Sequence, residues 1–169
     1  MFQGRSVAIR KEYDDRIEKA NELDLLGFGL SAFRQDYGQR FRDLAKTKKI
    51  RILLLDTHYP NDEAAYARQR DIEEGNLNGR IVGDIEEFIS FSRPITKEYP
   101  ENFNVRVMRA LPSINYFRLD DEILWGPYLI NMQSRNMPTF LVGKGGYLYE
   151  TLKEHFNTLW SDERFSRSI

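Results

Sequence analysis

The stretch that decides the fold is Ile50-Arg-Ile-Leu-Leu-Leu-Asp56, an aliphatic run that ends on a carboxylate. Its unbroken leucine run predicts a strand covered on both faces, as in a parallel sheet flanked by helices. Upstream, the apolar segment Leu23 to Leu30 predicts a second buried strand. Between these strands, Ser31 fits an N-cap and Ala32 to Thr47 has the apolar spacing of a helix. A charged helix is expected before them, over Arg5 to Ala20.

Downstream of the central strand the chain reads as two helices. Asn61 or Asp62 can cap the first, which should run to about Glu74. Ile81 to Phe91 carries apolar residues at helical spacing and predicts the second. Pro94 should end it, since proline interrupts a helix interior.

The second half predicts short strands close together in sequence, which favours antiparallel or mixed neighbours. They are expected over Asn104 to Ala110, Asn115 to Leu119, Glu122 to Leu129 and Thr139 to Val142, before a closing helix at Tyr147 to Trp160. The expected fold class is α/β, with a mixed, largely parallel sheet flanked by helices on both faces. We expect one domain over residues 1–169, with the N-terminal helix in 1–20 and a frayed polar tail in 162–169.

Composition narrows the function classes. The 25 basic and 26 acidic residues give a net charge of −1, so no strong signal points to nucleic acid or membrane. The chain has no cysteine, which excludes thiolate chemistry and favours a reducing, cytoplasmic location. No carboxylate or histidine cluster has metal-binding spacing, and we expect neither metal nor cofactor. The 169 residues suit one domain, although the chain can also be a fragment of a longer protein.

The element order, together with the segment Leu111 to Tyr128, resembles one half of the phospholipase D superfamily. That family's signature is His, one residue, Lys, four residues, then Asp. With Asp120 at the signature aspartate, Ser113 stands where the histidine belongs and Asn115 where the lysine belongs. The resemblance therefore implies a degenerate half-domain without the catalytic His and Lys. It also implies a homodimer, because active sites of this family combine two halves.

Several residues are candidates for binding a ligand. Asp56 and His58 follow the central strand, and carboxyl ends of strands are where open α/β sheets bind ligands. Arg109 and Arg118 lie on the signature strands and Lys144 precedes a glycine pair at a helix start, so each cation can take an anion. The complete candidate set is Asp56, His58, Arg109, Ser113, Asn115, Arg118 and Lys144. The alternative for these side chains is a solvated surface, or ion pairs with nearby acidic residues.

The function expected from the resemblance is a non-catalytic module that binds a phosphate-bearing small molecule, for example a nucleotide, in a sensing, regulatory or defence context. One alternative is a divergent dimeric phosphodiesterase or nuclease that uses His58 with Asp56. Another is a homodimerising interaction domain without a small ligand.

Overall fold

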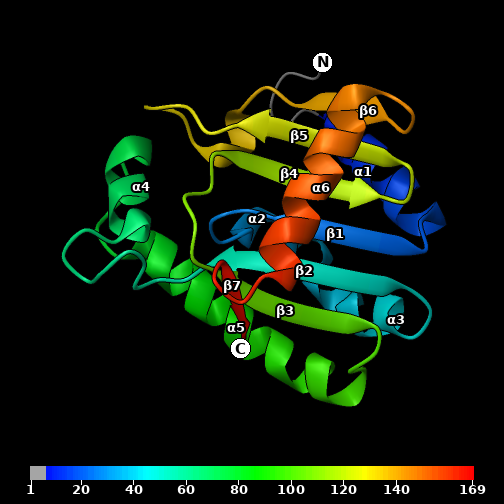
Figure 1. The fold of residues 1–169 in the computed structure, drawn as a ribbon, viewed down its shortest axis with the longest axis horizontal. Coiled ribbons are helices and arrows are strands. Elements are labelled where there is room, and N and C mark those ends of the chain that lie inside the picture. The colour runs from blue at the N-terminus through cyan, green and yellow to red at the C-terminus, as the bar shows by residue number, and fades with distance from the viewer. Residues whose placement is uncertain (1–6) are drawn as a thin grey trace.

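The computed structural model describes residues 7–169, with side chains from Arg10 onward, and shows a seven-stranded sheet between two layers of helices (Figure 1). The strand order is β6-β5-β4-β1-β2-β3-β7. The strands are β1 (Glu22–Leu26), β2 (Lys49–Leu55), β3 (Phe103–Met108), β4 (Ile114–Leu119), β5 (Glu122–Pro127), β6 (Phe140–Gly143) and β7 (Ser166–Ser168). The helices are α1 (Val7–Lys19), α2 (Ser31–Tyr37), α3 (Phe41–Ala45), α4 (Tyr66–Glu74), α5 (Arg80–Glu98) and α6 (Tyr147–Ser161), with 3₁₀-helices η1 (Gly38–Arg40) and η2 (Ser134–Asn136).

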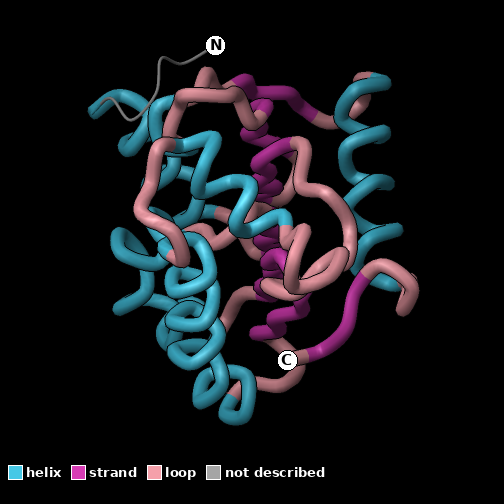
Figure 2. The backbone as a smooth tube through the Cα atoms, turned by 90° about the vertical axis from the view of Figure 1, so that its left-hand side faces the viewer, coloured by secondary structure: helices cyan, strands magenta, loops and turns pink. Residues whose placement is uncertain are grey.

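The two faces of the sheet pack against different helices (Figure 2). One face packs on α1, α2, α3 and α5 through the larger core cluster, which includes Ile17, Phe33, Phe41 and Phe88. The other face packs on α6 through a smaller cluster around Tyr116 and Phe156. The α/β fold with helices on both faces is confirmed.

The sheet is mixed, but the expectation that it is largely parallel is wrong. Among the described strands only β1–β2 and β2–β3 pair in parallel. The pairs β1–β4, β3–β7, β4–β5 and β5–β6 are antiparallel. The aliphatic run of β2 predicts how β2 pairs with its two neighbouring strands, and both of those pairs are parallel. The short connections after β4 produce antiparallel pairs in the rest of the sheet.

Three helix boundaries differ from the expected ones, and the first two residues expected in the N-terminal helix lie outside the described part of the chain. Ser31 does not cap α2; the preceding Leu30 occupies the cap in a left-handed conformation with φ of 47°. Asn61 binds the backbone N–H groups of a turn at residues 63 and 64, so α4 begins only at Tyr66. Pro94 lies inside α5 and does not end it, because the buried face of that helix continues through Ile95.

The tail expected to fray forms β7 at the edge of the sheet. Its backbone pairs with β3, and the buried Ser166 hydroxyl accepts a hydrogen bond from Arg106 at 2.9 Å. Short polar strands of this kind carry no hydrophobic alternation, which is why the sequence pattern missed it. Within residues 7–169, no helix combines the length and apolar character needed to cross a lipid bilayer.

Candidate functional site

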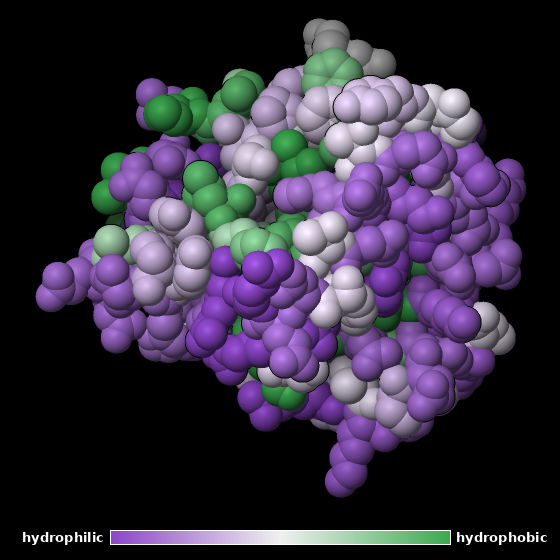
Figure 3. All heavy atoms as spheres, viewed as in Figure 1, coloured by the Kyte–Doolittle hydropathy of each residue, from purple (hydrophilic) through white to green (hydrophobic). Residues whose placement is uncertain are grey.

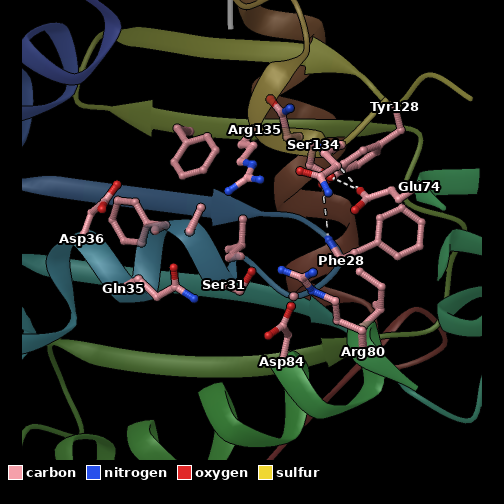
Figure 4. A pocket seen from close by; sticks show the side chains of 18 of the residues that line it. Phe28, Ser31, Gln35, Asp36, Glu74, Arg80, Asp84, Tyr128, Ser134 and Arg135 are labelled. Atoms are coloured by element: carbon pink, nitrogen blue, oxygen red, sulfur yellow. Dashed lines mark hydrogen bonds between the residues drawn. The ribbon is translucent and has the colours of Figure 1, made fainter. Parts of the chain in front are cut away.

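A cavity of about 200 Å³ lies at the edge of the sheet where β1 ends and β4 begins (Figure 4). Its lining comes from α1, the β1–α2 loop, α2, the end of α4 and the turn after it, the first turns of α5, β4, and the connection from β5 to β6. That connection, residues 128–139, is here called the strap. Segments distant in sequence thus meet around one space, as ligand sites in α/β folds commonly do.

Aromatic rings form the apolar walls of the cavity. Phe28 and Tyr128 meet edge to face with ring centroids 4.9 Å apart, and Tyr13 meets Phe117 in the same way at 5.3 Å. Burial raises the pKa of Tyr13 and of Tyr128, so both phenols remain protonated near neutral pH. The walls therefore offer flat apolar surface together with neutral hydroxyl groups.

The polar lining includes side chains with no partner inside the protein. Asn115 is 9 % exposed, and its amide forms no hydrogen bond with any described residue. Arg10, Arg80 and Arg135 also line the cavity, and none of them makes an ion pair with another residue in 7–169. Figure 4 shows Arg80 and Arg135 reaching into the same space from opposite sides, from α5 and from the strap. The Asn115 amide opens into the cavity, where a ligand or a water molecule can bind it, and together with the arginines it favours a polar, anionic occupant.

Carboxylates share the lining with these cations. Asp84 lies one helical turn after Arg80 on α5 and has no ion-pair partner within the described residues. Glu74 is engaged by Arg70 at 2.9 Å and by the Ser134 hydroxyl at 2.6 Å. Burial raises the pKa of Tyr37 most, Asp14 raises it further, and the charge of Asp36 adds a smaller effect.

The strap is fixed to α4 by the fully buried Arg70. Its guanidinium donates to the carbonyl oxygens of Leu129 and Met132 at 3.2 and 3.1 Å, and lies 4.9 Å from the centroid of the Tyr128 ring. Ser134 is tied to the same helix through the Glu74 carboxylate. The cavity wall contributed by the strap is therefore positioned by one helix.

The outer side of this region is unusually apolar. Large hydrophobic side chains that are exposed there belong to α4, the turn after it and the strap, namely Ile72, Leu77, Leu129 and Ile130. In the space-filling view, hydrophobic atoms gather on that side of an otherwise largely hydrophilic face (Figure 3).

The seven residues predicted from the sequence do not converge on one cleft. Asn115 lines the cavity, whereas Ser113 is exposed and only its carbonyl is used, as acceptor for the Tyr128 backbone N–H at 3.1 Å. Arg118 points to the α6 face and the opposite edge of the sheet, where it binds Asp24 at 2.5 Å. Lys144 is exposed and pairs with Asp121 at 3.0 Å. Arg118 and Lys144 therefore do not line the cavity with Asn115, because strand alternation turns Arg118 away from Asn115 and the turn after β6 lies at the far edge.

Asp56, His58 and Arg109 do lie together, in a cluster outside the cavity lining. The Arg109 and Arg167 guanidinium groups donate to the same Asp56 oxygen at 3.3 and 3.2 Å. Burial alone would raise the pKa of Asp56, but the His58 backbone N–H and the two arginines outweigh it and lower the pKa. This cluster ties the ends of β2, β3 and β7 together.

The expected pairing of the His58 imidazole with Asp56 is not formed. The imidazole Nδ1 lies 2.5 Å from Asp62, and the His58 side chain is 73 % exposed. Only the His58 backbone N–H reaches Asp56. Asp62 raises the pKa of His58 by hydrogen bonding and charge. No group of three or more His, Cys, Asp or Glu side chains within 7–169 is arranged to hold a metal ion.

Two solved structures share the fold of this chain. The chain superimposes on phosphatidylserine synthase from Haemophilus influenzae, a phospholipase D superfamily protein, with a TM-score of 0.60 and 12 % identity. The match covers 99 % of this chain and 38 % of that one. The fold of this chain is thus distantly similar to that of this phospholipase D superfamily protein. The archaeal chromatin protein TrmBL2, whose structure shows a novel mode of DNA binding, also matches, with a TM-score of 0.54 and 19 % identity over 97 % of this chain and 51 % of that one.

The chain spans about half or less of the length of these two proteins. No family model matches it. No curated protein matches it either. Identities this low establish the fold alone.

The residues that the sequence analysis aligned with the phospholipase D signature have different structural roles. Asn115, at the lysine position, faces the cavity. Asp120 adopts a positive φ of 51° in the β4–β5 turn, and its carboxylate accepts hydrogen bonds from the backbone N–H groups of Asn21 and Glu22. Asp120 therefore serves the fold by holding the start of β1.

The sequence reading missed Arg10, Arg80 and Arg135, which are isolated charges on separate elements. The signal that was available is the length of the strap, because long connections without regular structure are often functional. The sequence pattern does not show that α1 and α5 lie next to the strap.

Proposed function

We propose that this chain is a non-catalytic phospholipase D-like module that binds a phosphate-bearing small molecule, such as a nucleotide, in the cavity beside Asn115, in a sensing or regulatory role. The observation that carries the proposal is the buried, unpartnered Asn115 amide in a cavity that Arg80 and Arg135 enter without ion-pair partners among the described residues.

The chemistry of the lining supports this assignment. Guanidinium groups bind phosphate oxygens through paired N–H donors, and the Asn115 amide can donate a further hydrogen bond. The rings of Phe28 and Tyr128, which meet edge to face, supply apolar contact for the organic part of such a ligand. The sequence-based alternative of a hydrolase with a His58–Asp56 dyad is not carried forward, because the imidazole pairs with Asp62 instead.

Thermal unfolding in the presence of ligand tests the proposal. We expect adenosine monophosphate or another phosphorylated compound at millimolar concentration to raise the midpoint, since a ligand that binds only the folded state stabilises it. The isosteric variant Asn115→Asp should weaken binding by about tenfold or more, because a carboxylate replaces the amide donor and repels the phosphate.

A matched pair of arginines on one helix provides the control. Arg80 lines the cavity, whereas Arg93 is exposed on the same helix and does not. Arg80→Ala should lower the affinity and Arg93→Ala should leave it unchanged. If no phosphorylated compound, inorganic phosphate included, shifts the midpoint of the unaltered protein, the proposed function is wrong.

A further inference from the structure

We infer that Asp84 is a specificity-determining residue of this cavity, and that it binds adjacent hydroxyl groups on the organic part of the ligand. The ligand class is then a phosphate ester of a polyhydroxylated group, such as a sugar phosphate or the ribose of a nucleotide. This assignment rests on the function proposed above, because it describes the part of the ligand that the arginines do not hold.

Asp84 lies on the face of α5 that borders the cavity. It follows Arg80 by four residues, and side chains with this spacing are neighbours on one face of a helix. A Cβ atom on Gly29 would lie 3.3 Å from the Asp84 Cβ atom, so this side chain packs against the loop between β1 and α2. Figure 4 shows Asp84 and Arg80 reaching into the cavity from the same helix. A ligand whose phosphate binds Arg80 therefore presents its adjoining atoms to Asp84, about 5 Å further along the helix.

The Asp84 carboxylate is available to a ligand, whereas the other carboxylates of the lining are engaged. Glu74 is held by Arg70 and by the Ser134 hydroxyl, and Asp36 is not free either. Asp84 forms no hydrogen bond and no ion pair with any residue in 7–169, its neighbour Arg80 included. An ionised carboxylate only accepts hydrogen bonds, so the group that binds it must be a donor.

A ligand that fills the cavity must replace the hydration of Asp84. The residue is partly exposed, so water reaches its carboxylate while the cavity is open. A ligand that displaces this water without offering donors leaves a desolvated carboxylate close to a phosphate, which lowers the affinity. Two adjacent hydroxyl groups restore the lost hydrogen bonds, as ribose hydroxyls do with acidic side chains in dinucleotide-binding folds.

The surroundings of Asp84 favour neutral donors over an ammonium group. A ligand cation at Asp84 would also lie beside the Arg80 guanidinium and be repelled by it. Ser31 and Gln35 of α2 line the same cavity, and their side chains form no hydrogen bond with any described residue. A hydroxyl and an amide both donate and accept, so they match the further hydroxyl groups of a sugar.

Calorimetric titration with matched ligands tests the role of Asp84. Glycerol 3-phosphate and propyl phosphate share a three-carbon chain and a phosphate, and differ only in two adjacent hydroxyl groups. Adenosine 5′-monophosphate and its 2′,3′-dideoxy form differ in the same way. We expect the hydroxylated member of at least one pair to bind about tenfold or more tightly, the usual worth of a hydrogen bond to a charged group.

Variants of two acidic residues on α5 show whether Asp84 causes the preference. In Asp84→Ala the ratio should fall below about threefold, while the compound without hydroxyls keeps its affinity. Asp84→Asn keeps the shape of the side chain and should also reduce the ratio, which covers the case of an alanine variant that does not fold. Glu86→Ala is the control, because Glu86 is exposed on the same helix outside the cavity lining and its loss should leave the ratio unchanged.

The outcomes separate this inference from the proposed function. Equal binding within both pairs, or a preference that both Asp84 variants retain, would overturn the role of Asp84 while the cavity remains a phosphate site. Tighter binding of phosphoethanolamine than of glycerol 3-phosphate would overturn it as well, because the donor would then be an ammonium group. Absence of binding by every phosphorylated compound would overturn the proposed function itself.

Discussion

Asp24 holds together a row of charged side chains on the α6 face of the sheet, namely Arg51, Asp24 and Arg118. Its carboxylate is almost fully buried and lies between Arg118 at 2.5 Å and Arg51 at 2.6 Å, on the two strands that flank β1. Arg118 is itself 7 % exposed, so it relies on this partner and on Glu22. These ion pairs connect β1 to its antiparallel neighbour β4 and to its parallel neighbour β2.

Replacing Asp24 with asparagine removes the charge and keeps the shape. We predict that Asp24→Asn lowers the free energy of unfolding by about 3 kcal/mol, because one partner of a buried ion pair is left uncompensated. Urea unfolding followed by circular dichroism measures this loss. Asp121→Asn is the control, since Asp121 and Lys144 are both more than half exposed and the pair should contribute less than about 1 kcal/mol. Equal effects of the two variants would contradict the role given to Asp24.

The sequence predicts the place of a single side chain best when that place depends on one strand alone. Asn115 was found because the signature alignment puts it on β4 with its side chain on the cavity face. Arg118 was misplaced because it lies three positions later, and an odd offset along a strand points to the other face. Arg80 and Arg135 could not be found, since only the packing of α5 and the strap brings them together.

The position of the strap depends on a close contact between its end near Pro138 and strand β5. A Cβ atom on Gly126 of β5 would lie 2.3 Å from the carbonyl oxygen of Pro138, so only glycine allows the strap to lie against β5 there. We predict that Gly126→Ala lowers the free energy of unfolding by about 1–3 kcal/mol and weakens ligand binding, because the strap must shift. Differential scanning calorimetry and ligand titration measure the two effects.

Gly143→Ala in β6 is the control, because a Cβ there meets no atom within 4 Å. It should change stability by less than about 0.5 kcal/mol. A Gly126→Ala variant with unchanged stability and affinity would show that the strap does not depend on this contact.

At the same scale, the long and strongly patterned elements were predicted well. The strand expected at Ile50 to Asp56 and the closing helix match β2 and α6 within one residue at either end. The elements that went wrong carry weak local signals. Helix α5 continues beyond Pro94 because Ile95 is buried, and the polar β7 forms because its backbone pairs with β3. Neither effect can be predicted from a local sequence pattern.

Across the whole molecule, Asp56 links the ends of three strands and should control stability in acid. Its pKa in the folded state is lowered, so the ionised carboxylate stabilises the fold above its unfolded-state pKa of about 3.9. That contribution is lost as pH falls through the folded-state value. We predict that the difference in unfolding midpoint between the unaltered protein and Asp56→Asn is largest near pH 7 and shrinks below about pH 4. A difference that is constant from neutral to acidic pH would argue against the linkage.

Binding of a phosphate-bearing ligand in the cavity that Asn115 lines can be tested at single residues. Two-dimensional NMR of the ¹⁵N-labelled protein, titrated with adenosine monophosphate, tests it most directly. We predict shifts of the Asn115 side-chain amide, of the Phe28 backbone amide and of the strap around Arg135, with the Asp56 cluster unaffected. Shifts confined to Arg109, Arg167 and their neighbours, or no shifts at saturating ligand, would contradict it.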